Sequence, residues 1–203
     1  MLEEKDELQY QDPKLLLDDF IKTGSAGKIG KLADFYSPDI RPKLIKFYNL
    51  WNEMDNQYNL LLELIEKKYN CREIPKYAQI KSCFQIMQTS KTNLEKNRVR
   101  KNIININVEN IKIPEEDSTM KKLPFSSFYK IIRLLISKLE QRDGYWFMTL
   151  NKKLLEDKFD DNLVAMCVGL EDNIQKIAEL KHLVDKNEIT KAEFLEKLKK
   201  VQY

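Results

Sequence analysis

Residues 44 to 65 read LIKFYNLWNEMDNQYNLLLELI, and this stretch decides the fold class. Its apolar residues recur at alternating spacings of three and four, which is the seam of an amphipathic helix: Leu44, Phe47, Trp51, Met54, Tyr58, Leu61 and Ile65. A helix of roughly 28 residues is about 42 Å long, so this seam must lie on other helices. Its large aromatic residues favour packing within one chain over an intermolecular coiled coil. Whether the 44–65 face is internal or an interface stays open at this point.

The composition favours a mainly α protein built as a multi-helix bundle. The chain has 203 residues, of which 42% are hydrophobic and 33% are charged, with a net charge of +3 and only 5 Gly and 6 Pro. Few backbone breaks favour long helices, and the apolar content excludes a disordered chain. The acidic first residues do not resemble a secretory signal, and no apolar run approaches the about 20 residues of a membrane span. We therefore expect a cytoplasmic protein.

The N-terminal part predicts a short helix followed by a linker. Asp12 and Pro13 suit the start of a helix, and Gly24 suits its end. The glycine cluster at 24–30 lacks the spacing of a phosphate-binding loop and is interpreted as a flexible linker. We divide the chain into residues 1–36 (helix and linker), 37–172 (helical body) and 173–203 (C-terminal hairpin).

Within the body, the pattern predicts a second long helix over 77–94 and a helix over 124–142. An amphipathic segment follows over 145–155, and Asp160 or Asp161 caps a further long helix. Isoleucine and valine alternate with asparagine after residue 102, which predicts a small β ribbon near 103–113 with a turn at Glu109 or Asn110.

The most specific local pattern lies at residues 174–199, IQKIAELKHLVDKNEITKAEFLEKLK. Asn187 suits the positive φ that ends one helix, and Thr190 with Glu193 forms a capping box that starts the next. Ile189 and Phe194 form a hydrophobic staple around that cap. So small a hairpin cannot bury its apolar residues alone, so it must dock on the body or on another copy. These residues are the candidate protein-interaction site: Ile177, Leu180, Leu183, Val184, Ile189, Phe194 and Leu198.

This hairpin resembles the SHOCT domain, a short C-terminal module of many prokaryotic and phage proteins. The family usually has glycine where this chain has Asn187. The resemblance covers about one eighth of the chain, as one small domain would. It implies an oligomerisation or docking element and a bacterial, archaeal or phage source. The residues that carry it are Ile177, Leu180, Leu183, Asp185, Ile189, Thr190, Glu193, Phe194 and Leu198.

Catalytic and metal-binding patterns are poor. The chain has three cysteines without a Cys-x-x-Cys pair, and its one histidine, His182, lies between Lys181 and Leu183 as a surface residue of a helix. Carboxylates alternate with lysines, as on solvated helix faces. We therefore predict no enzyme, no catalytic residue, no cofactor, no metal and no small-molecule substrate.

Two functions follow as hypotheses. The first is a non-enzymatic assembly or adaptor subunit that oligomerises or docks on a partner protein through helical surfaces. The alternative is a nucleic-acid-binding protein, in replication or transcription, that uses a basic cluster at a helix end to contact phosphates. Those cations could instead complement a helix dipole. The cluster comprises Lys91, Lys96, Arg98, Arg100 and Lys101.

Overall fold

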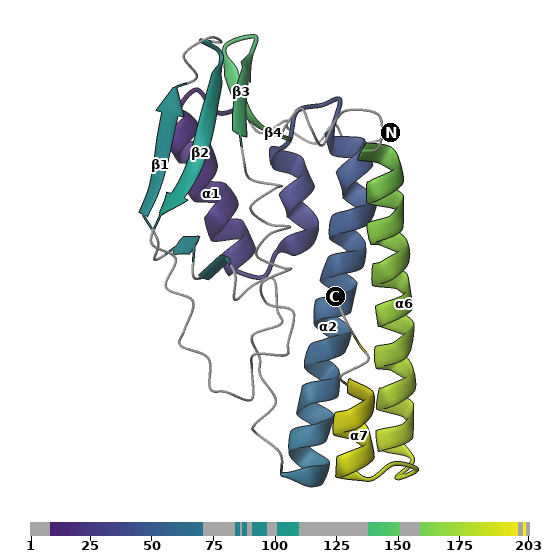
Figure 1. The fold of residues 1–203 in the computed structure, drawn as a ribbon. Coiled ribbons are helices and arrows are strands. Elements are labelled where there is room, and N and C mark those ends of the chain that lie inside the picture. The colour runs from purple at the N-terminus through teal and green to yellow at the C-terminus, as the bar shows by residue number, and fades with distance from the viewer. Residues whose placement is uncertain are drawn as a thin grey trace, which may run out of the picture.

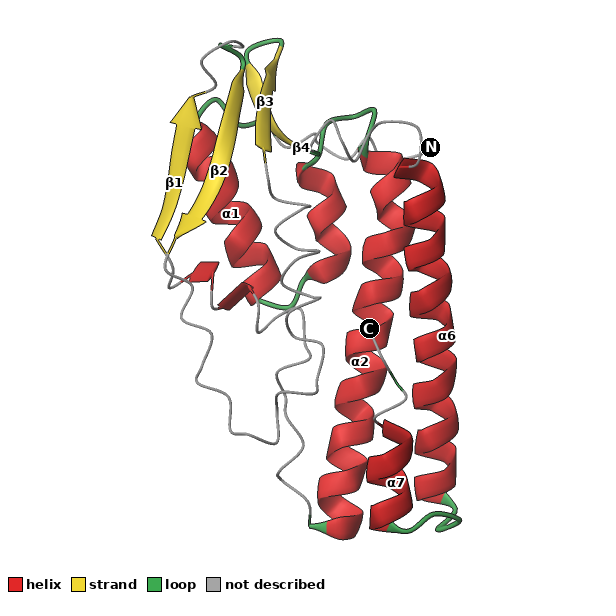
Figure 2. Ribbon diagram, in the orientation of Figure 1, coloured by secondary structure: helices red, strands yellow, loops and turns green. Residues whose placement is uncertain are grey.

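The computed structural model describes residues 9–70, 84–85, 87–88, 91–96, 101–109, 138–150, 159–198 and 201. The fold is mainly helical with a small four-stranded antiparallel sheet, which confirms the predicted class. Figure 2 shows the strands gathered at one end of the molecule, next to α1, with the long helices α2 and α6 on the other side. No helix of the described residues is long and apolar enough to cross a membrane.

The predicted seam forms α2 (Arg41–Tyr69), a helix of 29 residues that ends at Asn70 with a positive φ of 48°. All seven seam residues are buried in the single chain, which answers the open question: this face is internal. Figure 1 shows why, because α2 lies alongside α6 (Phe159–Asp185) and α7 (Lys191–Leu198). The seam residues are Leu44, Phe47, Trp51, Met54, Tyr58, Leu61 and Ile65.

The first helix, α1 (Pro13–Ser25), begins as predicted, because the Asp12 carboxylate accepts a hydrogen bond of 2.8 Å from the backbone N–H of Lys14. The linker interpretation of 24–30 is wrong. Gly24 is buried within α1, and the chain continues directly into a 3-10 helix, η1 (Ile29–Phe35), whose residues Ile29, Leu32, Ala33 and Phe35 are buried. Apolar residues within and directly after the glycine cluster supply the burial that fixes this segment on the core.

The sheet is larger than the predicted ribbon. Its order is β1-β2-β3-β4, with β1 (Lys91–Lys96), β2 (Ile103–Glu109), β3 (Lys138–Arg142) and β4 (Tyr145–Thr149). β2 pairs with the preceding β1 and with β3. The partner that we predicted for β2, over 111–113, lies outside the described residues.

Two helix predictions are corrected where they meet the sheet. Residues 91–94 belong to β1 and not to the end of a helix, and residues 138–142 form β3. The segment that starts at 145 opens as strand β4. These stretches are short, so an apolar spacing that fits one helix face fits one sheet face as well.

The register of the strands buries one face of the sheet. Ile104 is paired with Leu139, and Leu139 with Met148, and all three side chains are at most 4% exposed. The outer edge of β4 is held by the N-terminal part, since Trp146 donates its backbone N–H to the carbonyl of Tyr10 at 2.7 Å. This contact ties the sheet to the segment that leads into α1.

Candidate functional site

The residues that we predicted for protein interaction lie inside the chain. Six of them are at most 8% exposed, and Leu183 is partly buried, because the hairpin of α6 and α7 packs on α2. The described fold therefore uses this set for internal docking, and a partner would reach it only if the hairpin left α2. The six are Ile177, Leu180, Val184, Ile189, Phe194 and Leu198.

The local design of the hairpin agrees with the sequence prediction. Asn187 has a φ of 57°, and the Glu193 carboxylate accepts from the backbone N–H of Thr190 at 2.9 Å, while the hydroxyl of Thr190 accepts from the N–H of Glu193 at 3.3 Å. The hydrogen bonds that the backbone N–H and the hydroxyl of Thr190 donate to the Glu193 carboxylate lower the pKa of Glu193 below its usual value. The capping box is thus formed as predicted, and Ile189 and Phe194 are both buried beside it.

Two residues at the end of α2 hold the hairpin in place. The Lys68 ammonium donates to the carbonyl of Asp185 at 2.6 Å and to the side-chain oxygen of Asn187 at 2.9 Å. The Tyr69 hydroxyl donates to the carbonyl of Ile189 at 2.5 Å. A cation at the carboxyl end of α6 also complements the dipole of that helix. No local pattern predicts these contacts, because they join residues more than a hundred positions apart.

The described lysines of the predicted basic cluster belong to a β hairpin and not to a helix end. Lys91 and Lys96 stand at opposite ends of β1, about 17 Å apart along a strand of this length. Lys101 is exposed in the connection that leads into β2. Arg98 and Arg100 lie outside the described residues, so nucleic-acid binding stays a prediction.

The surface with the clearest geometry is the groove between α2 and α6. The two helices run parallel and side by side (Figure 1): the Lys43 ammonium binds the Asp160 carboxylate at 2.8 Å near their start, and Lys68 binds the carbonyl of Asp185 near their end. Both contacts join residues 117 positions apart, so the two helices begin and end at about the same level. The parallel arrangement places side chains of the two helices next to one another along the groove.

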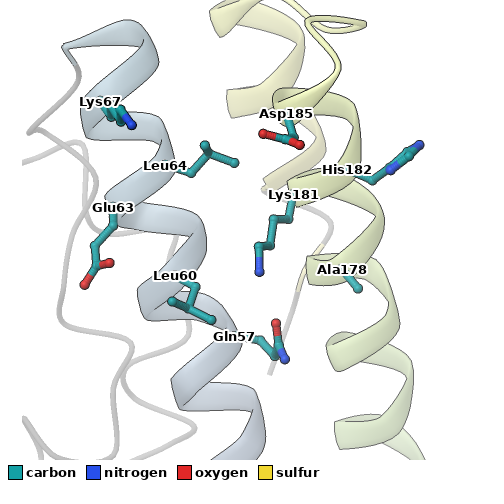
Figure 3. A pocket seen from close by; sticks show the side chains of 9 residues that line it. All are labelled: Gln57, Leu60, Glu63, Leu64, Lys67, Ala178, Lys181, His182 and Asp185. Carbon is teal, nitrogen blue, oxygen red and sulfur yellow. The ribbon is translucent and has the colours of Figure 1, made fainter.

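Toward the C-terminal ends of both helices, this α2–α6 groove has a volume of about 610 Å³. Figure 3 shows Leu60 and Leu64 of α2 and Lys181 and Asp185 of α6 pointing into the space between the helices, with Glu63 and His182 turned outward at its two margins. Leucines flanked by charges of both signs suit contact with an amphipathic surface. The complete lining is Gln57, Leu60, Glu63, Leu64, Lys67, Ala178, Lys181, His182 and Asp185.

Exposed apolar side chains continue the groove toward the start of α6. Val164 is 61% exposed, Val168 57% and Leu60 45%. Val164 and Val168 precede Ala178 and His182 by 14 residues each, which is two heptads, so all four share one side of α6. The groove face is therefore a second stripe on each helix, separate from the buried seam.

Near the start of the groove, a lysine of α2 forms an ion pair with a glutamate of α6. The Lys46 ammonium lies 2.9 Å from the Glu171 carboxylate, and this pairing raises the pKa of Lys46. Burial raises the pKa of the neighbouring Cys167 thiol, which is 5% exposed. Among the described residues, no three His, Cys, Asp or Glu side chains come together in a way that could hold a metal ion.

Comparison with known proteins found no match for this chain among family models, curated proteins or solved structures.

Proposed function

We propose that the protein is a non-enzymatic assembly or adaptor subunit that docks on a partner protein through the α2–α6 groove. The observation that carries this proposal is the exposed apolar stripe on two long parallel helices, with Val164, Val168 and Leu60 all more than two-fifths exposed. Large side chains of this kind are usually buried, and several of them exposed along one groove favour an interaction surface.

The helix pair already accepts one helix within the chain. α7 packs on α2 and α6, and its Phe194 and Leu198 are buried there. Two adjacent helices present a groove on each of their free sides, and a third helix fits such a groove by placing its side chains between theirs. The α2–α6 groove is the corresponding surface that α7 does not fill, so the natural occupant is a helix of another protein.

The proposal is tested by paired substitutions on the groove. Leu60→Asp with Val168→Asp places two carboxylates on the apolar stripe at exposed positions, so the fold should survive. A partner captured from the native host is purified and titrated against the wild type, the double variant and a control variant. We expect the affinity to fall at least about tenfold, which is 1.4 kcal/mol, whereas Ala192→Asp on the exposed side of α7 should leave it unchanged. Equal affinity of all three proteins would refute docking at this groove.

Nucleic-acid binding is a second candidate, supported by one observation. The β1–β2 hairpin brings the backbones of Lys96 and Lys101 to the same end of the sheet, on either side of the connection that contains Arg98 and Arg100. The two arginines of this connection, together with the lysine on each side of it, would contact phosphates with an affinity that falls as salt rises. Reversing the charge of Arg98 and Arg100 should shorten retention on immobilised DNA at every salt concentration; unchanged retention would eliminate this function.

A further inference from the structure

The α2–α6 groove face is layered, and its layers differ in chemistry. On the groove side, α2 carries Leu50, Glu53, Gln57 and Leu60 in that order, and α6, which runs in the same direction, carries Val168, Glu171, Gln175 and Ala178. Consecutive residues of each set are three or four positions apart, which keeps them on one side of their helix. The face therefore reads apolar, acidic, amide and apolar from one end to the other.

The acidic layer carries an excess of negative charge. Glu171 is paired with Lys46, and both side chains remain about half exposed. Glu53 is exposed, and within the described part of the chain it makes no ion pair. Lys46, Glu53 and Glu171 therefore leave one net negative charge on this layer, directly between two apolar layers.

This excess disfavours a second copy of the chain as the occupant. If two copies met face to face at this layer, four carboxylates would share two lysines. Like charges brought together at an interface lower the binding affinity, by about 1,000-fold where the cost is 4 kcal/mol. The same excess attracts a cation, because Arg and Lys are the side chains that satisfy carboxylates and amide oxygens together.

We infer that the occupant of the α2–α6 groove is an amphipathic helix of a partner protein that carries an arginine or lysine between two apolar residues. This inference rests on the proposed docking function and specifies the partner. The two apolar layers are ten residues apart on α2, from Leu50 to Leu60, which is about 15 Å. The partner helix therefore has apolar residues ten or eleven positions apart, with its cation three or four positions from one of them.

The test uses three synthetic helical peptides that share apolar residues eleven positions apart and differ only in the intervening residue, Arg, Gln or Glu. Each is made in both sequence directions, and binding to the full chain is measured by fluorescence anisotropy. We expect the Arg peptide to bind at least about tenfold more tightly than the Glu peptide. Glu53→Arg should reverse this order, whereas Glu188→Arg, the same charge change in the α6–α7 turn, should preserve it.

The possible failures are distinguishable. If all three peptides bind equally and Leu60→Asp weakens each of them, helix docking stands and the cation requirement is overturned. If no peptide binds, and light scattering shows a dimer that Leu60→Asp dissociates, the occupant is a second copy and this inference is overturned. If no peptide binds, the chain is a monomer and Leu60→Asp does not affect any captured partner, the proposed function fails as well.

Discussion

Replacing Phe194 by alanine tests whether the C-terminal hairpin is part of the core. Phe194 is 0% exposed in α7, where it packs against the α2–α6 pair. Truncating a fully buried phenylalanine costs about 3–5 kcal/mol, because the lost contacts leave a cavity that the surroundings fill only partly. For a chain of this size, each kcal/mol lowers the melting temperature by about 2–4 °C. Phe194→Ala should therefore melt about 6–20 °C below the wild type.

The assay is thermal unfolding followed by far-UV circular dichroism, with Glu196→Ala as the matched control. Glu196 is exposed on the same helix, and alanine is at least as good a helix former, so the control should stay within about 0.5 kcal/mol of the wild type. If Phe194→Ala melts with the control, the hairpin does not stabilise the fold. Internal docking of the predicted interaction residues would then be wrong, and an external role for them would return.

Further predictions concern single positions. Gly24→Ala should destabilise the protein by about 1–3 kcal/mol in urea unfolding, because a Cβ there would overlap the ring of Phe84; Gly169→Ala, in the open middle of α6, should instead stabilise it by up to about 1 kcal/mol. Equal effects of the two would contradict the contact with Phe84. Because the capping box lowers the pKa of Glu193, its stabilisation is present above the ordinary pKa of 4.5 and disappears as the pH falls through the lowered value. Thr190→Ala should cost about 0.5–2 kcal/mol at neutral pH and less in acid; a cost that does not depend on pH would contradict this role.

The helical part of the fold was predictable because local signals there agree with tertiary packing. The heptad seam of α2 is buried along its whole length, and the capping box at Thr190 starts α7 as expected. At both places one sequence period or one cap specifies the conformation without help from distant residues.

The sheet was less predictable because its strands have only five to seven residues, too few to separate a strand period from a helix period. One signal was available and was interpreted as a helix end: Asp143-Gly144, both with positive φ, makes the two-residue turn that joins β3 to β4. An Asp-Gly pair between alternating residues is among the strongest hairpin signals. This pair therefore predicts a strand on each side of the turn, where β3 and β4 lie.

The groove could not be predicted, because it depends on which helices become neighbours. Leu60 and Val168 stand outside the main seam of each helix, and single exposed apolar residues are ordinary on protein surfaces. They form one surface only because α2 and α6 lie parallel and side by side, which brings these residues to one face.

Site-specific cross-linking tests the docking surface most directly. A photoreactive amino acid is placed at Val168 in the full chain, expressed in its native host, with Ala192 on α7 as the exposed control position. We predict a discrete adduct with one partner protein from Val168, none from Ala192, and loss of the Val168 adduct when Leu60→Asp is added. An adduct from Ala192 alone, or one from Val168 that Leu60→Asp leaves intact, would contradict docking in the α2–α6 groove.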